Sequence, residues 1–306
     1  MLTIANAPCR KHMTPILLLE QILNGVQLGV MLFLLAAGLT LVFGIMNLIN
    51  LAHGSMYMLG AYLAATLQQW TGSFVLAVLL ALPVTLVIGL LVEIIALRTL
   101  YQRDHLDQVL ATFGLMLFFN ELVRLLWGPQ AYHMALPVAL SGHVSLLPGV
   151  RYPAYRLAIM GVGLVIAGGL AWLIKRTRLG MWIRAGASNR TMIAALGVNI
   201  TWLYTFVFGL GAALAGLAGM MAGPILALQV GMGESILILT FVVIVIGGIG
   251  SVHGAFLAAL LVGVVDTFGR VFLPPALASM TIYLLMAVVL CWRPQGLFPV
   301  HKGFST

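Results

Sequence analysis

The chain has 306 residues, of which 62% are hydrophobic and 7% are charged, and its mean hydropathy is +1.12. About a quarter of the residues of a typical soluble domain are charged, so this composition excludes a soluble globular protein and indicates a polytopic membrane protein. The net charge of +8 does not indicate nucleic acid as a partner, because the basic residues lie in short loops and at the ends of apolar segments.

The first apolar run covers residues 16–36 and is expected to be an uncleaved membrane span, since no small-residue cleavage site follows it. The next stretch, 37–66, is too long for one plain span of about 20 residues and too short for two. One span there gives nine in total, with the N-terminus outside; two give ten, with it inside. Arg10 and Lys11 favour ten and the short half-segments favour nine, so both counts remain open.

Polar residues interrupt the stretch 37–66 at its centre. Asn47, Asn50 and His53 are three residues apart, and Gly44 and Gly54 lie on either side of them. Each polar side chain needs a partner, because an unpaired polar group in hydrocarbon costs several kcal/mol. Two interpretations remain open. The side chains hydrogen-bond a neighbouring helix, or they line a translocation path where a helix is broken.

The rest of the chain alternates between apolar segments and polar intervals. The interval 98–107 is a mixed-charge loop, and the Pro-rich interval 128–153 is expected to be an external loop without much regular structure. Two oppositely charged couples at helical spacing, Glu121 with Arg124 and Asp266 with Arg270, are expected to form ion pairs. The further predicted spans are 74–97, 109–127, 157–174, 201–223, 235–246, 255–272 and 279–292.

The span 201–223 is rich in small residues spaced four apart, such as Ala212 with Gly216 and Gly219 with Gly223. This spacing lets two helix backbones approach closely. The span is therefore expected in the middle of the packed bundle.

The interval 175–199 is the only long polar stretch in the second half of the chain, and it holds five of the fifteen basic residues and no Asp or Glu. Short loops with excess Lys and Arg stay in the cytoplasm, so we expect this loop and the basic C-terminal tail on that side. Met192 and Leu196 fall at helical spacing and predict a short helix in the loop. Ser188 and Asn189, which precede them, are good N-cap residues.

No residue pattern supplies a chemical driving force. None of the lysines follows a glycine as in a P-loop, and the charges within the spans are few and mostly self-paired. Catalytic motifs are absent, and Cys9 and Cys291 fit neither a metal site nor a disulfide framework. We predict no enzymatic activity, no cofactor and no metal. Two function classes remain: a membrane subunit driven by a separate ATPase, and a self-sufficient channel or transporter.

Three stretches resemble the signature motifs of one permease family. They are GLTLVFGIMNLINLAHGSMYMLGAY at 38–62, TRLGMWIRAGASNRTMIAALGVN at 177–199 and GGIGSVHGAFLAALLVG at 247–263. In order and spacing they are similar to the LivH-type permeases of branched-chain amino acid ABC importers. The resemblance covers the chain from about Leu18 to Gly296.

The resemblance implies an all-α transmembrane bundle of about eight to ten spans, a single permease domain over 1–306 in the bacterial inner membrane. It implies as partners a second, LivM-like permease, cytoplasmic ABC ATPase subunits and a periplasmic substrate-binding protein. The expected cargo is a branched-chain amino acid. Urea or a short amide is the alternative, because importers of these compounds use similar permeases, and a self-sufficient channel or facilitator is a further one.

The resemblance also assigns roles to individual residues. Asn47, Asn50, His53 and Gly54 would line or shape the substrate path at the interface with the partner permease. Segment 184–196 would be a rigid helix that docks in a groove of the ATPase. Its contact residues would be Arg184, Ala185, Gly186, Asn189, Arg190, Met192 and Leu196. Close helix packing or a hinge is expected at Gly216, Gly219, Gly223, Gly247, Gly248, Gly250 and Gly254.

Overall fold

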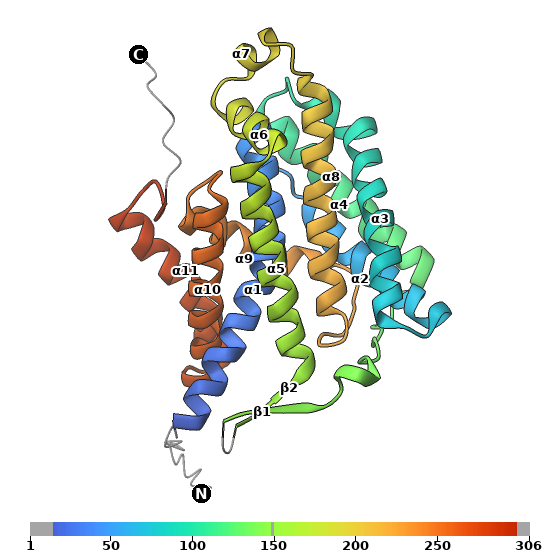
Figure 1. Ribbon diagram of the computed structural model, residues 1–306, viewed down its shortest axis with the longest axis vertical. Coiled ribbons are helices and arrows are strands. Elements are labelled where there is room, and N and C mark those ends of the chain that lie inside the picture. Colours follow the sequence, from blue (N-terminus) through green and yellow to red (C-terminus); the bar gives the residue numbers. More distant parts are fainter. Residues whose placement is uncertain (1–14, 148–149, 299–306) are drawn as a thin grey trace, which may run out of the picture.

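The computed structural model describes residues 15–147 and 150–298. These residues form eleven α-helices, and all except α6 and α7 pack side by side as an elongated bundle (Figure 1). Helices α6 and α7 lie at one end, and α1 starts at the other. The helices are α1 (Pro15–Met46), α2 (His53–Thr71), α3 (Phe74–Val92), α4 (His105–Trp127), α5 (Ala154–Arg176), α6 (Arg178–Ser188), α7 (Arg190–Ala195), α8 (Ile200–Ala222), α9 (Met232–Gly247), α10 (Val252–Phe272) and α11 (Pro275–Trp292).

Six of the described helices are long and apolar enough to cross a membrane: α1, α3, α4, α5, α8 and α10. Helices α9 and α11 are also apolar but shorter, and α2 has 19 residues with a more polar sequence. The predicted all-α polytopic bundle is therefore confirmed. The predicted spans agree with these helices to within a few residues, except at the start of the chain.

Helix α1 has 32 residues and does not end where the sequence predicted. The first span was expected to stop at residue 36, but α1 continues to Met46, and α2 starts only at His53. The stretch 37–66 therefore adds one bundle helix rather than two. The bundle has nine helices in the described residues, of which six are long and apolar enough to cross a membrane, and the choice between nine and ten spans stays a prediction. Arg10 and Lys11, which favoured ten spans, lie outside the described residues.

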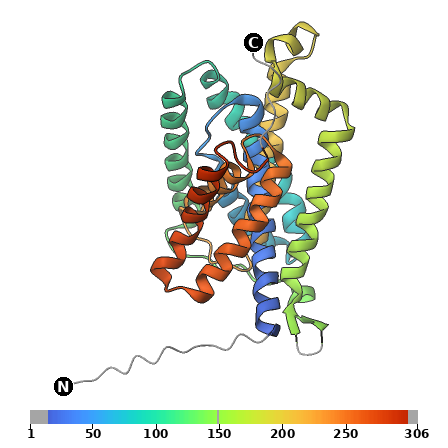
Figure 2. The same cartoon turned by 90° about the vertical axis from the view of Figure 1, so that its left-hand side faces the viewer.

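Helices α1 and α8 lie at the centre, with α4 and α5 toward opposite sides of the bundle (Figure 2). In the most apolar window of α1 and of α8, 83% of the residues are buried, against 28% or less in α3, α4 and α5. A helix that is apolar on all sides is stable where other helices surround it. The central position of α8 agrees with the prediction from its small residues.

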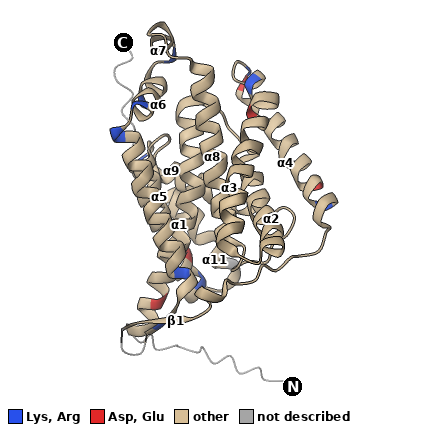
Figure 3. Cartoon of the chain, turned by 45° about the vertical axis from the view of Figure 1, so that its right-hand side comes forward, with Lys and Arg blue, Asp and Glu red and all other residues tan. Residues whose placement is uncertain are grey.

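Lys, Arg, Asp and Glu residues lie mostly toward the ends of the helices (Figure 3). The two predicted ion pairs are formed: Arg124 lies 3.2 Å from Glu121, and Arg270 lies 2.8 Å from Asp266. Each couple is within one helix, so the pairing offsets part of the cost of charge near the membrane.

The interval 128–153 is more regular than expected. Strands β1 (His143–Leu147) and β2 (Val150–Pro153) pair in an antiparallel hairpin. The backbones of Tyr132 and Leu228 exchange two hydrogen bonds of 2.8 Å, which join this interval to the connection between α8 and α9. The prolines led to an expectation of little regular structure, whereas two short segments joined by a Pro-Gly dipeptide are a hairpin signal.

Glycines bring the backbones of the central helices into contact. A Cβ added at Gly60 of α2 would overlap the carbonyl oxygen of Gly216 in α8, and one at Gly219 would overlap that of Tyr57. A Cβ at Gly223 would lie 2.7 Å from Sδ of Met134. These positions have no room for a side chain, and the close approach adds van der Waals contact that lipid cannot replace.

We predict that Gly219→Leu destabilises the folded chain by about 3 kcal/mol or more, because overpacking forces the backbones of α2 and α8 apart. The measurement is the thermal unfolding temperature of the purified chain in detergent. Gly168→Leu is the matched control, since an added Cβ at Gly168 in α5 meets nothing within 4 Å. Equal unfolding temperatures for the two variants would refute the packing role of Gly219.

Candidate functional site

The chain leaves the helical conformation between α1 and α2, over residues 47–52. Asn47 has a φ of 51° in the left-handed region, which asparagine tolerates because its short polar side chain hydrogen-bonds locally. Its N–H still donates to the carbonyl oxygen of Phe43 at 2.9 Å and closes the last turn of α1. The interruption expected at the centre of 37–66 therefore lies between two bundle helices.

The polar side chains after the break point into the protein. Asn50 and His53 are 0% exposed, and His53 Nε2 lies 3.2 Å from the carbonyl oxygen of Leu35 in α1. Within the described residues, both amide atoms of Asn50, Nδ1 of His53 and Oγ of Ser55 are buried without a hydrogen-bond partner. An unpaired buried polar atom costs about 1–3 kcal/mol, and its retention indicates bound water or a function.

Three of the four residues expected along the substrate path are thus enclosed by the chain: Asn50, His53 and Gly54 are buried, and Asn47 is exposed. In this conformation, the side chains of Asn50 and His53 do not reach the surface of the subunit. Asn47 is the one with a side chain at the surface of the subunit.

Glycines lie at two close helix contacts beside this break. A Cβ at Gly38 of α1 would lie 3.1 Å from Cε1 of His53 and 2.7 Å from the carbonyl oxygen of Gly211 in α8. A Cβ at Gly54 would overlap the carbonyl oxygen of Gly233 in α9. The start of α2 therefore meets the backbone of α9 at Gly54, and the His53 ring fills the space beside Gly38, where α1 meets α8.

The second glycine motif joins α9 to α10 and meets the first motif. Added Cβ atoms at Gly247 and Gly254 would each overlap the backbone of the other residue, so these helix ends pack backbone to backbone. Gly248 and Gly250 have φ values of 100° and 84°, which glycine adopts without strain. A Cβ at Gly44 in α1 would stand 3.2 Å from Cα of Gly250. The two motifs therefore form one contact region.

The basic loop forms two helices, α6 and α7, and segment 184–196 spans both. Asn189 lies between them in an extended conformation, and its side-chain oxygen accepts a hydrogen bond of 2.9 Å from the N–H of Met192. The expectation of one rigid helix over 184–196 is therefore wrong. The physical reason is this asparagine cap, which ends one helix and begins the next.

Most of the residues expected to touch the ATPase are accessible. Met192 and Leu196 are 64% and 77% exposed, so this part of the loop presents two large apolar side chains. Arg184 donates a hydrogen bond to the carbonyl oxygen of Ile174, so it also holds the C-terminal end of α5. Gly186 is buried. The exposed members of the set are Arg184, Ala185, Asn189, Arg190, Met192 and Leu196.

The inner face of α6 rests on two bundle helices. Ile183 is buried in the main apolar core. A Cβ at Gly186 would lie 3.4 Å from Cδ2 of Leu203 in α8 and 3.8 Å from Cγ2 of Ile45 in α1. Ile45 is two residues before Asn47, so α6 contacts α1 directly beside the break.

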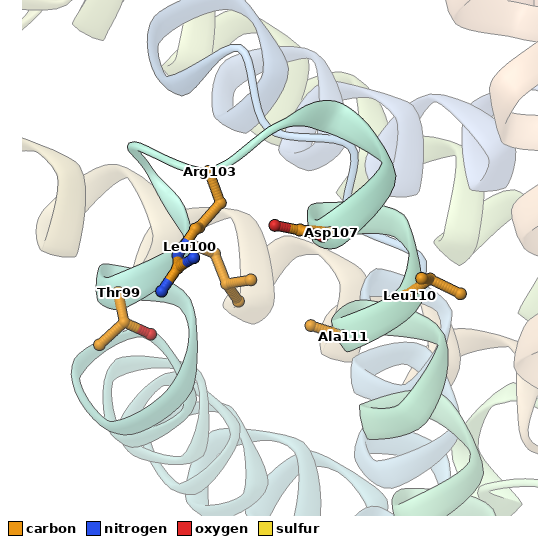
Figure 4. Close-up of a pocket in the computed structure, with 6 residues that line it drawn as sticks. All are labelled: Thr99, Leu100, Arg103, Asp107, Leu110 and Ala111. Carbon is orange, nitrogen blue, oxygen red and sulfur yellow. The ribbon is translucent and has the colours of Figure 1, made fainter.

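A cavity of about 560 Å³ opens between the end of α3 and the start of α4 (Figure 4). The mixed-charge loop contributes Arg103 and Asp107 to its lining. The lining residues are Thr99, Leu100, Arg103, Asp107, Leu110 and Ala111. Among the described residues, no group of three His, Cys, Asp or Glu could hold a metal ion.

Glu93 is a buried residue of this region that the sequence interpretation missed. It is 0% exposed and accepts a 2.6 Å hydrogen bond from the hydroxyl of Tyr101. Burial, together with this hydrogen bond, raises the pKa of Tyr101, so its hydroxyl stays protonated and donates. A lone Glu inside the predicted span 74–97 was the signal that could have identified it.

The family described as "Branched-chain amino acid transport system / permease component" matches residues 21–290 of the chain. The chain belongs to this family. It is therefore a multi-pass membrane permease subunit, in agreement with its six long apolar helices. No solved structure matches the chain significantly.

Several permeases of known transport systems are similar to it. The high-affinity branched-chain amino acid transport system permease protein BraD of Pseudomonas aeruginosa is 32% identical over 293 residues, which cover 91% of this chain and 95% of BraD. The corresponding LivH of Escherichia coli K12 is 28% identical, with 91% and 94% covered. LivM of Salmonella typhimurium is 27% identical over 88% of this chain and 68% of LivM. The permease thus resembles both LivH and LivM proteins.

For the permease we predict that Asn189→Ala destabilises α7, since loss of an N-cap costs about 1 kcal/mol. The fraction of molecules in which α7 is unfolded should then rise by a factor of roughly five. The measurement is the rate of limited trypsin cleavage after Arg190 in detergent, which should rise about fivefold. Ser188→Ala is the control, because Ser188 caps neither helix. An unchanged cleavage rate for Asn189→Ala would show that the cap does not hold α7.

Proposed function

We propose that this permease is one membrane subunit of an ATP-driven importer of branched-chain amino acids in a bacterial inner membrane. The observation that carries the proposal is the contact of α6 with Ile45 and Leu203. The next helix, α7, and the residue after it present the exposed apolar side chains of Met192 and Leu196. A helix pair with an exposed outer face and an inner face on two central helices suits the transfer of motion from a partner. The names of BraD and LivH support the cargo.

The end of the bundle that carries α6 and α7 is the cytoplasmic one in this proposal. The loop 175–199 has five basic residues and no acidic ones, and short loops of this kind stay inside. Helix α1 then starts on the periplasmic side and α11 ends toward the cytoplasm. The nine bundle helices of the described chain are compatible with this orientation.

Coupling would work by displacement of α6. Closure of two ATPase subunits on ATP would move the surface of α7 that they hold, with Met192 and Leu196 as apolar anchors. Arg190 and Asn189 would add polar contacts at the same surface. Because Gly186 lies against Ile45 and Leu203, movement of α6 would be passed to the end of α1 and to α8.

The substrate path would run beside the break that follows α1. Asn47 is exposed there. The side-chain amide of Asn50 and Nδ1 of His53 are buried nearby and have no hydrogen-bond partner in the described structure. A zwitterionic amino acid with an aliphatic side chain needs a mostly apolar path with a few hydrogen-bonding groups, as this region supplies. The glycine contacts around Gly54 would keep the break in place as α1 moves.

The proposed assembly contains a second permease, two ATPase subunits and a periplasmic binding protein. Similarity of this chain to both LivH and LivM supports a pair of related permeases around a shared path. The binding protein would largely select the cargo. Uptake assays with several substrates must therefore test urea and a short amide beside the branched-chain amino acids.

The first test replaces the outer apolar face of α7. We predict that Met192→Glu with Leu196→Glu abolishes co-purification of the ATPase and ATP-dependent leucine uptake in proteoliposomes, while membrane insertion is normal. Val138→Glu is the control, since Val138 is 91% exposed and lies far along the chain in the interval before β1. Normal ATPase binding by the double variant would refute the coupling role.

Uptake by the lone permease without ATP would favour a facilitator.

The second test concerns Asn50, whose side chain is fully buried and lacks partners. Replacing an unsatisfied buried polar group by an apolar one of similar size is nearly neutral or stabilising. We therefore predict that Asn50→Leu keeps the unfolding temperature and the assembled complex but lowers uptake strongly. Thr85→Val is the control, because the Thr85 hydroxyl donates within its own helix to Ala81. Disassembly of the Asn50→Leu complex would favour a packing role instead.

A further inference from the structure

The end of α3 nearest α6 and α7 changes its helical geometry at a buried acid. After Val92 the chain forms a π-helical turn, Glu93–Leu97, followed by a 3-10 turn, Arg98–Leu100. π-helical turns are rare, and those that occur are often found at functional sites. The Glu93 side chain, which opens this turn, is 0% exposed.

Both oxygens of the Glu93 carboxylate are bound by donors from two parts of the chain. The hydroxyl of Tyr101 donates to Oε1 at 2.6 Å, and the hydroxyl of Thr205 in α8 donates to Oε2 at 2.7 Å. Arg98 Nη2 lies 3.3 Å from Oε2 and 3.0 Å from Oγ1 of Thr205. A buried carboxylate with an ion pair and two hydroxyl donors avoids most of the cost of an unpaired charge.

This group of residues, the Glu93 cluster, lies beside the contact between α6 and α8. Leu203 of α8 faces Gly186 of α6, and Thr205, two residues later, binds Glu93. Between them, the ring of Tyr204 packs edge-on against the ring of Tyr101, with centroids 5.2 Å apart. Three consecutive residues of α8 therefore join α6 to the end of α3.

We propose that Glu93 is a positioning residue that fastens α3 to α8, so that displacement of α6 moves both helices as one unit. The inference rests on the proposed function of α6 and α7 as the contact with an ATPase. It goes beyond that function by naming the group that extends the motion from α8 to α3. Without the carboxylate, α8 would move with α6 while α3 stayed behind, and ATP hydrolysis would continue with little transport.

The contacts farther along α3 and α8 support movement as a unit. A Cβ at Gly89 would overlap the Ala212 side chain, and one at Gly209 would lie 2.6 Å from Cδ2 of Leu90. This close packing holds the two helices together along their length. The hydrogen bonds at Glu93 have defined geometry, so they add a fixed register at the end of α3.

The test is Glu93→Gln in the full complex of both permeases, ATPases and binding protein, reconstituted in proteoliposomes. We measure leucine uptake and ATP hydrolysis together. The ratio of leucine imported to ATP hydrolysed should fall roughly tenfold, because hydrogen bonds to a charged group are lost, while hydrolysis stays within about twofold. Glu121→Gln is the matched control, because that carboxylate is exposed and pairs only within α4 in the described structure, and its ratio should not change.

A second variant tests the same inference if Glu93→Gln does not fold. Tyr101→Phe removes one hydrogen bond and keeps the ring contact with Tyr204, and should lower the ratio roughly threefold. An unchanged ratio in either folded variant, or equal losses of uptake and hydrolysis, would overturn the positioning role. A wild-type complex that shows no ATP-dependent uptake would instead refute the proposed function.

Discussion

Backbone contact through glycine is the constraint on which the rest of this permease depends. In lipid, helices gain nothing from burying apolar side chains against each other, so association relies on close packing and hydrogen bonds. Gly60 against Gly216, Gly54 against Gly233 and Gly247 against Gly254 bring helix pairs together at distances that exclude any side chain. These contacts connect α2 to α8 and α9, and α9 to α10. They make the centre of the bundle rigid.

The rigid centre encloses a region that would otherwise be unstable. The break over 47–52 leaves Asn50 and His53 buried with unpaired polar atoms in the described structure. Such groups persist only where the surroundings leave the chain no alternative. The glycine motif at 247–254 supplies part of that restraint, because Gly250 lies directly against Gly44 just before the break. Packing and the candidate path are therefore parts of one arrangement.

The same arrangement explains how the outer helices connect with the interior. Helix α6 contacts both Ile45, beside the break, and Leu203, beside the Glu93 cluster. A force on α7 therefore has two short routes into the bundle, one to α1 and one to α8 with α3. Cores that are densely packed transmit displacement because they have little free volume to absorb it.

The sequence by itself determined the class of protein, the approximate spans, the ion pairs within helices and the Asn189 cap, since hydropathy, helical spacing and capping act between near neighbours in the chain. Only the tertiary structure decided that α1 continues to Met46, that Asn50 and His53 are enclosed, and that Glu93 meets Thr205. These outcomes depend on contacts between residues far apart in the chain, such as Glu93 with Thr205, which are 112 positions apart. Apolar helices look alike in sequence whether lipid or protein surrounds them, so burial follows from which helices become neighbours.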